Sequence, residues 1–160
     1  MAHLIEPHGG ELKNCFTSDA AALKAKAEGL TKVAVASADL STVYRIADGT
    51  LSPLTGFMTE SVYNQVLDSW TIDANGKKLA WSIPLSLPIS GEQADELNAG
   101  DEVALTSPAG EVVATMKVES IFEWDKIRYI QKVYLTDRAD HPGGDMVRTH
   151  PDFKDKTHLI

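Results

Sequence analysis

The sequence predicts an α+β fold in which short strands form a partly closed barrel with short flanking helices. Apolar residues recur with helical spacing in some stretches and alternate with polar residues in others. No regular long helix separates one strand from the next, which argues against a doubly wound parallel sheet. The 160 residues match the length of one domain and are enough to bury a core.

The N-terminal part is expected to contain an arm, two helices and a strand. Their ranges are an irregular arm at 1–16, a helix at 20–28, a short strand at 32–37 and a helix at 39–47. Ser18 or Asp19 is suited to cap the first helix, because both side chains accept hydrogen bonds from backbone N–H groups. Gly29 and Gly49 are suited to end the two helices.

The run Leu51–Met58 predicts a turn that buries apolar side chains. Pro53 fixes its own φ and pushes Ser52 out of the helical region. Gly56 is expected to allow a backbone conformation that other residues resist. Four large apolar residues surround the turn: Leu51, Leu54, Phe57 and Met58. A turn that must bury its side chains has a defined shape, so the run serves to identify the chain.

The middle of the chain predicts further short helices and strands. The expected elements are a helix from Thr59 to about Trp70, a hairpin or loop at Asn75-Gly76, a strand at 81–89, a helix at 91–98, strands at 102–106 and 111–123, and a helix from Asp125 to about Leu135. Ser90 is suited to cap the short helix. Pro84 and Pro88 cannot donate to a ladder, so the strand at 81–89 is expected at an edge or to be interrupted.

The apolar pattern collapses after residue 135. We therefore expect a domain over 1–135, followed by an extended exit segment or linker over 136–160, or a segment lying on a partner surface.

Charge and composition exclude several classes of function. The net charge of −8 argues against a nucleic-acid partner. The single Cys15 cannot form an intramolecular disulfide and fits a reducing compartment; it is expected to be a small buried residue rather than a nucleophile. No apolar run approaches membrane-spanning length and the N-terminus lacks a signal peptide, so the expected location is the cytoplasm.

The usual catalytic motifs are absent from the sequence. It has no Gly-rich phosphate loop, no Gly-x-Ser-x-Gly elbow and too few cysteines for a Cys-type zinc site. His141, His150 and His158 lie among aspartates near the C-terminus, but their spacings match no metal motif, and a solvated mixed-charge segment is the favoured interpretation.

Two loops and the aromatic residues leave alternatives open. Residues 140–144, Asp-His-Pro-Gly-Gly, suit either an acid–base loop or, more favourably, a turn that orders the end of the domain. His8 beside two glycines suits a ligand loop or, again more favourably, an N-terminal turn. The aromatic residues suit core packing better than base stacking, because no basic patch is interleaved with them: Trp70, Trp81, Trp124, Tyr129 and Tyr134.

Three segments together resemble the ATP sulfurylases, or sulfate adenylyltransferases. Residues 4–10 resemble that family's Pro-His-Gly-Gly start, and residues 51–58 resemble its Ser-Pro-Leu-x-Gly-Phe-Met run. Residues 133–137, followed by His141-Pro142-Gly143, resemble its Thr-x-Asp and His-Pro-Gly exit segment. Residues 81–85 also fit its Trp-x-x-Pro strand.

The resemblance covers the family's N-terminal domain and implies a PUA-like fold. It implies structural or interdomain roles, with no catalytic, ligand-binding or metal-binding residue. The residues that carry these roles are His8, Gly9, Gly10, Ser52, Pro53, Gly56, Phe57, Asp137, His141, Pro142 and Gly143. The family's catalytic Gln-x-Arg-Asn-Pro, His-x-x-His and Gly-Arg-Asp elements do not occur in this sequence.

The resemblance implies a parent enzyme that makes adenosine 5′-phosphosulfate and pyrophosphate from ATP and sulfate, with Mg²⁺. This segment alone is expected to be inactive and to need no cofactor. Its expected partner is the C-terminal catalytic domain of the same chain, with a neighbouring subunit as a further candidate. Two alternatives remain: a free-standing PUA-like module that binds RNA or a small molecule, and a regulatory or scaffold protein derived from the same domain.

Overall fold

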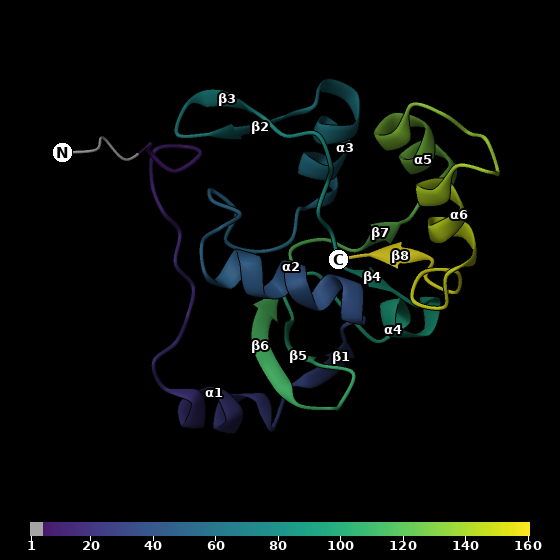
Figure 1. Cartoon of the computed structure of the whole chain (residues 1–160). Coiled ribbons are helices and arrows are strands. Elements are labelled where there is room, and N and C mark those ends of the chain that lie inside the picture. The colour runs from purple at the N-terminus through teal and green to yellow at the C-terminus, as the bar shows by residue number, and fades with distance from the viewer. Residues whose placement is uncertain (1–4) are drawn as a thin grey trace.

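The computed structural model describes residues 5–160, so the first four residues of the expected arm, and Leu4 of the first resembling segment, lie outside it. Helices and strands are interspersed along the described chain (Figure 1). The helices are α1 (Ala20–Ala27), α2 (Ser37–Ala47), α3 (Glu60–Ser69), α4 (Gly91–Asp95), α5 (Lys126–Tyr134) and α6 (Pro142–Thr149). The strands are β1 (Thr31–Ala34), β2 (Thr71–Ala74), β3 (Lys77–Ala80), β4 (Pro88–Ile89), β5 (Glu102–Thr106), β6 (Val112–Lys117), β7 (Phe122–Glu123) and β8 (His158–Leu159). This mixture confirms the α+β class.

The strands form three small sheets. In the first, β5 lies between β1, which runs parallel to it, and β6, which runs antiparallel. The second is the β2–β3 hairpin, and in the third β8 pairs antiparallel with both β4 and β7. Within residues 5–160 these sheets are open, and their hydrogen bonds do not close a barrel.

Local capping explains where several helices begin. The Asp19 carboxylate accepts a hydrogen bond from the backbone N–H of Ala22 at 2.8 Å and starts α1. Ser90 and Gln93 form a reciprocal capping box on α4, and Asp125 accepts from the N–H of Arg128 to start α5. The caps predicted at Asp19, Ser90 and Asp125 are therefore confirmed.

The strand predicted at 81–89 is confirmed only at its end, in β4. Residues 81–87 are irregular because their polar groups bond to another segment. The Met58 N–H donates to the Leu85 carbonyl at 2.7 Å, and the Ser86 hydroxyl donates to the Met58 carbonyl at 2.8 Å. The apolar alternation here reflects burial against residue 58 rather than a continuous ladder.

The prediction of an extended segment over 136–160 is wrong for two stretches. Residues 142–149 form α6, and β8 enters the third sheet between β4 and β7 (Figure 1). Leu87 and Ile160 exchange two backbone hydrogen bonds of 2.8 and 3.0 Å. The last residues are thus part of the core, which their sparse apolar pattern did not indicate.

The core has two parts, which β8 connects. The aliphatic core lies around the first sheet and contains Val33, Val35, Val43, Leu87, Ile89, Leu97, Val103, Leu105, Val118 and Ile160. The aromatic cluster lies around α3 and contains Met58, Tyr63, Val66, Leu67, Ile72, Phe122 and Leu159, with Trp124 and Tyr129 packed against it. Leu159 and Ile160 are neighbours in sequence and belong to different parts.

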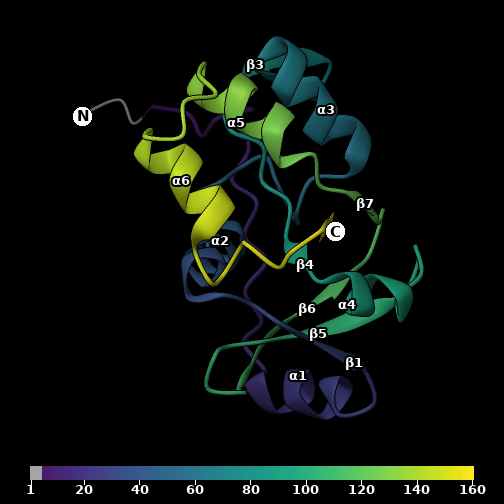
Figure 2. The same cartoon turned by 90° about the vertical axis from the view of Figure 1, so that its right-hand side faces the viewer.

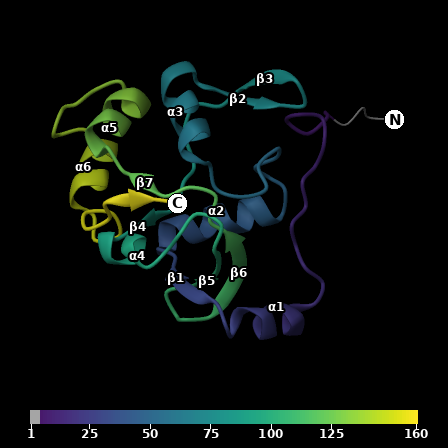
Figure 3. The same ribbon diagram turned by 180° about the vertical axis from the view of Figure 1, so that it is seen from behind.

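Helices lie at opposite ends of the molecule, and the N-terminal arm follows one edge. Figure 2 shows α1 beside the first sheet at one end of the molecule, with α3 and α5 at the other end. Figure 3 shows the N-terminal arm running along one edge, from the β2–β3 hairpin to α1. Among residues 5–160, none of the helices has the length and apolar character needed to cross a membrane.

Candidate functional site

The structure brings two of the predicted motifs together at a contact that we call the arm–turn junction, residues 8–10 and 49–53. Gly9 has φ +85°, and a Cβ there would lie 3.2 Å from the Pro53 Cβ and 3.3 Å from Leu79. The Asn75 amide donates to the Gly9 carbonyl at 2.9 Å, and His8 Nε2 donates to the Ala80 carbonyl at 3.0 Å. The Gly9 position therefore requires glycine for both its backbone conformation and its close packing.

Ser52 is a buried connector within the same junction, only 3 % exposed. Its hydroxyl donates to the Gly49 carbonyl at 2.6 Å and accepts from the Lys13 N–H at 2.9 Å. The Ser52–Pro53 peptide bond is cis. The hydroxyl both donates and accepts a hydrogen bond within the fold, which fits a structural role for Ser52.

The rest of the turn differs from expectation at Gly56. This residue does not adopt a positive φ, and a Cβ there would meet nothing within 4 Å. The prediction that Gly56 provides a special backbone conformation is therefore wrong. Phe57 is half-buried and packs against the aliphatic core.

The third motif forms the start of α6. His141 is the N-cap, its Nδ1 accepting from the Gly144 N–H at 3.3 Å, and its ring lies 4.9 Å from the Tyr134 ring. Pro142 is the first residue of the helix. A Cβ at Gly143 would lie 2.5 Å from Tyr134 Cζ, so this glycine lets the helix pack against α5.

The acid–base interpretation of this loop has no support in its contacts. The Arg138 guanidinium makes two hydrogen bonds to the Asp140 carboxylate, at 2.8 and 2.6 Å. This pairing holds the pKa of Asp140 below its usual range. The Asp137 carbonyl accepts from Arg148 at 3.1 Å, which ties the loop back to α6. The contacts fit a turn that orders the chain.

The motifs form two separate groups rather than one site. Figure 1 shows the N-terminal arm on one side of the molecule and the α5–α6 pair on the other. Among residues 5–160, no group of three or more His, Cys, Asp or Glu side chains is placed to hold a metal ion.

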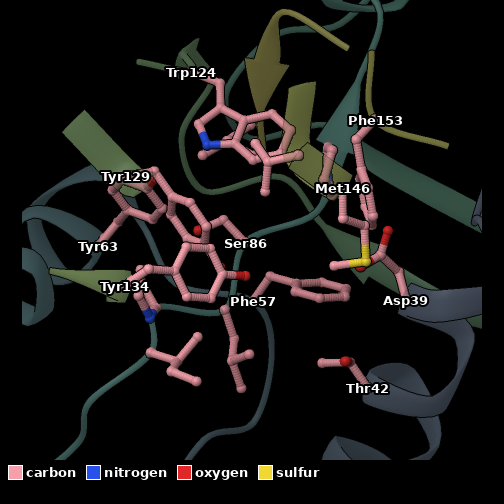
Figure 4. A pocket seen from close by; sticks show the side chains of 16 residues that line it. Asp39, Thr42, Phe57, Tyr63, Ser86, Trp124, Tyr129, Tyr134, Met146 and Phe153 are labelled. Carbon is pink, nitrogen blue, oxygen red and sulfur yellow. The ribbon is translucent and has the colours of Figure 1, made fainter. Parts of the chain in front are cut away.

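A cavity that the sequence analysis did not single out lies between α2, α5, α6 and residues 83–88. We call it the aromatic cavity; its volume is about 120 Å³. Figure 4 shows its rings facing Asp39 and Thr42 of α2. Six aromatic side chains line it: Phe57, Tyr63, Trp124, Tyr129, Tyr134 and Phe153.

The rings of the cavity form a connected chain of edge-to-face contacts. Tyr129 lies 5.8 Å from Trp124 and 6.2 Å from Tyr134, with interplanar angles of 79° and 84°. Trp124 in turn lies 6.2 Å from Phe153 at 82°. Such pairs are favourable and hold the rings in fixed orientations.

The polar groups at the cavity are incompletely paired. Burial, with a smaller contribution from the nearby Asp152 carboxylate, raises the pKa of Asp39 to about 6, against an opposing effect of Lys156. Tyr63 Oη and Trp124 Nε1 are buried without a hydrogen-bond partner in the described structure. Burial also raises the pKa of Tyr63; the nearby Trp124 indole opposes that rise, although the two polar atoms do not meet the geometry of a hydrogen bond. Unpaired buried polar atoms are rare in folded proteins and call for an explanation.

The sequence predicts the packing role of the aromatic residues but not the place of Asp39 at the cavity. Core packing is confirmed for Trp81, Trp124 and Tyr129, but Trp70 is 52 % exposed. Cys15, predicted to be buried, is exposed. Asp39 was assigned only to the start of a helix. Its spacing of four residues from the buried Val43 places it toward the interior, and this is the signal that would have found it.

Comparison with known proteins gives a consistent result. The PUA-like domain family matches residues 5–154. A sulfate adenylyltransferase from Pyropia yezoensis is 50% identical over 116 residues, which is 72% of this chain and 28% of that protein. Another, from Desulforamulus reducens, is 38% identical over 143 residues, which is 88% of this chain and 36% of that protein.

A solved structure is similar as well. The hexameric APS kinase from Thiobacillus denitrificans matches with a TM-score of 0.67 and 27% identity, over 76% of this chain and 24% of that chain. In all three cases the chain spans only about a quarter to a third of the protein it matches.

Proposed function

The chain belongs to the PUA-like domain family, and we propose that it is the N-terminal, non-catalytic domain of a sulfate adenylyltransferase. The observation that carries this proposal is the asymmetry of the matches. Two sulfate adenylyltransferases match 72% and 88% of this chain but only 28% and 36% of their own lengths. A sequence that corresponds to so small a part of these enzymes fits one of their domains.

The parent enzyme in this proposal transfers the adenylyl group of ATP to sulfate, using Mg²⁺, and releases pyrophosphate. Stabilising the charge that develops at phosphorus requires cations and hydrogen-bond donors that converge on one point. Arg128, Arg138 and Arg148 are each engaged in hydrogen bonds within the fold. The chemistry is therefore assigned to the remainder of the parent chain.

The partner in this proposal is the C-terminal catalytic domain, with a second subunit as a further partner and the cytoplasm as location. In this proposal residues 136–160, whose α6 and β8 pack on the domain that residues 1–135 form, lead toward the catalytic part. The open sheets correspond, in this proposal, to the partly closed barrel expected of the fold.

The motif residues have structural tasks in this proposal. One group fixes the arm–turn junction: His8, Gly9, Gly10, Ser52, Pro53, Gly56 and Phe57. The other fixes the start of α6: Asp137, His141, Pro142 and Gly143. Apart from Gly56 and Pro142, each of these residues is supported by close contacts or hydrogen bonds within the domain.

A chimera tests the assignment to this enzyme class. We expect the Pyropia sulfate adenylyltransferase to keep sulfate-dependent release of pyrophosphate when its matching N-terminal segment is replaced by this chain. The same enzyme with that segment deleted is the control and is expected to lose stability or activity. A chimera that folds, as shown by circular dichroism and gel filtration, but releases no pyrophosphate contradicts the proposal.

A second assay tests the non-catalytic character. The 160-residue chain alone is expected to release no more pyrophosphate from ATP with sulfate than without sulfate. A sulfate-dependent rate from the isolated chain would show that the domain carries the chemistry itself.

A second candidate function is a free-standing PUA-like module that binds a small molecule, and the aromatic cavity is the observation that favours it. Fluorescence anisotropy at low salt tests the RNA version of this alternative. Given the net charge of −8, we expect no salt-sensitive RNA binding at micromolar protein.

A further inference from the structure

The Asp39 carboxylate makes no direct polar contact in the described structure. Among residues 5–160 it has no hydrogen-bond or ion-pair partner, although its side chain is partly buried at the aromatic cavity. Two charged groups from the segment after α6 act on the pKa of Asp39: Asp152 raises it and Lys156 lowers it. Asp39 in turn raises the pKa of Tyr129 in α5. The carboxylates of Asp39 and Asp152 outnumber the single ammonium of Lys156, so the net negative charge near Asp39 favours an added cation.

The rings opposite Asp39 provide the second half of a cation site. An aromatic face attracts a cation through the negative charge above its ring, and Trp is the strongest of these rings. The Trp124 indole already accepts one cation: the Lys126 ammonium lies 5.1 Å from its centroid. Lys126 is held by the Phe153 and Lys154 carbonyls and does not line the cavity, so it does not fill the space before Asp39.

We propose that the aromatic cavity binds a small organic cation, a quaternary or protonated ammonium group, between its aromatic rings and the Asp39 carboxylate. The rings surround the alkyl groups of the ligand, and Asp39 neutralises its charge. Figure 4 shows the geometry on which this depends, with Trp124, Tyr129 and Tyr134 on one side and Asp39 on the other.

The size and polarity of the cavity narrow the ligand class. A volume of about 120 Å³ suits a head group such as trimethylammonium and is small for a nucleotide. An anion is disfavoured because it would face Asp39, whose charge the nearby Asp152 carboxylate reinforces. Water alone would pair the polar atoms, but it would leave the carboxylate without a cation in direct contact. This inference does not depend on the proposed function, since a cation site is compatible with either candidate.

The first test compares a cation with its uncharged isostere. The full chain is titrated with choline and with dimethylbutanol, in which carbon replaces the ammonium nitrogen. Binding is followed by tryptophan fluorescence and by the indole N–H resonance of Trp124 in NMR spectra. We expect choline to shift this resonance and to bind at least about tenfold more tightly than the isostere.

Matched variants locate the site. Asp39→Asn keeps the shape of the side chain and removes its charge, and it is expected to weaken choline binding about tenfold and to abolish the preference over the isostere. Asp145→Asn, an exposed carboxylate of α6 outside the cavity, is the control and should leave both affinities unchanged. NMR spectra of both variants show that they fold.

Several results would overturn the proposal. One is the absence of any shift of the Trp124 resonance up to about 100 mM choline, because the dissociation constant expected for this site lies well below that concentration. Another is equal binding of choline and the isostere. A third is choline binding that survives Asp39→Asn while the variant remains folded.

Discussion

The aliphatic core and the aromatic cluster bury side chains in two different ways. The aliphatic core is made of Val, Leu and Ile, several of them entirely inaccessible to solvent. The aromatic cluster borders a cavity and holds two buried polar atoms without a partner, Tyr63 Oη and Trp124 Nε1. Both regions lie in one small domain and are joined through β8.

The difference separates stability from binding capacity. Close-packed aliphatic side chains maximise dispersion contacts and leave no space for a ligand. Aromatic rings around a cavity with an unpaired carboxylate sacrifice some stability, which is typical of sites that bind. We therefore expect substitutions in the aliphatic core to destabilise strongly, and removal of polar groups from the aromatic region to cost little or to stabilise.

The largest expected effect is at Ile89, which is 0 % exposed in the aliphatic core. Ile89→Ala removes three buried carbons in a region that cannot collapse around the space, so we expect a loss of about 2–4 kcal/mol in the free energy of unfolding. The measurement is urea denaturation followed by circular dichroism. Ile127→Ala, at a residue 63 % exposed on α5, is the control and should cost less than about 0.5 kcal/mol. Equal losses in both variants would contradict the special role of this core.

The next largest effect is expected where the aromatic region is tightly packed. At Gly143 an added methyl group would meet the Tyr134 ring at 2.5 Å, and the ring is too rigid to yield easily. Gly143→Ala should lower stability by about 1–3 kcal/mol despite the better helix propensity of Ala. Gly29→Ala is the matched control, because nothing lies within 4 Å of its added Cβ. If Gly143→Ala raised the melting temperature, α6 would not be held against α5 as described.

Local signals and long-range contacts explain which features the sequence predicted. The helix starts at Asp19, Ser90 and Asp125 depend on a side chain and a backbone N–H three residues away, so the sequence indicates them directly. Residues 81–87 and β8 depend instead on bonds to distant segments, such as Met58 to Leu85 and Leu87 to Ile160. No local period encodes such pairings.

The candidate site was predictable to a similar extent. The motif glycines were visible in the sequence, but only the structure shows that Gly9 meets Pro53 and that Gly143 meets Tyr134. The aromatic cavity combines side chains from segments that lie far apart in the sequence, including Asp39 of α2 and Phe57 of the turn. The sequence indicated that its aromatic residues pack in the core, but it gave no sign that Asp39 differs from the other residues of its helix.

The third prediction concerns the charge of Asp39. Because the folded protein raises the pKa of this carboxyl to about 6 from its ordinary value of 3.8, the folded state binds the proton more tightly than the unfolded chain. The contribution of Asp39 to stability is therefore highest below pH 4, falls as the pH rises from about 4 to about 6, and stays lower above that range. Asp39→Asn should stabilise the protein by about 1–2 kcal/mol at pH 7, after allowance for partial exposure, and should have little effect at pH 4.

Urea denaturation at the two pH values measures this effect, with Glu119→Gln at an exposed acid as the control. A stabilisation of the Asn variant that is equal at pH 4 and pH 7 would assign the effect to packing rather than to charge. Addition of choline should reduce the difference between wild type and variant at pH 7, because the bound cation compensates the carboxylate.

The smallest effect is expected at Tyr63, where a single buried hydroxyl distinguishes the aromatic cluster from the aliphatic core. Tyr63→Phe keeps the buried ring and its edge-to-face contact with Phe122 at 5.3 Å, and it removes a hydroxyl that has no partner in the described structure. Relief of the unpaired group should stabilise the fold by up to about 1 kcal/mol. Tyr44→Phe, at an exposed ring, is the control and should change stability by less than about 0.5 kcal/mol. A loss of more than about 1 kcal/mol for Tyr63→Phe would mean that the hydroxyl is paired in solution. The aromatic region would then lose no stability through an unpaired polar group at this atom.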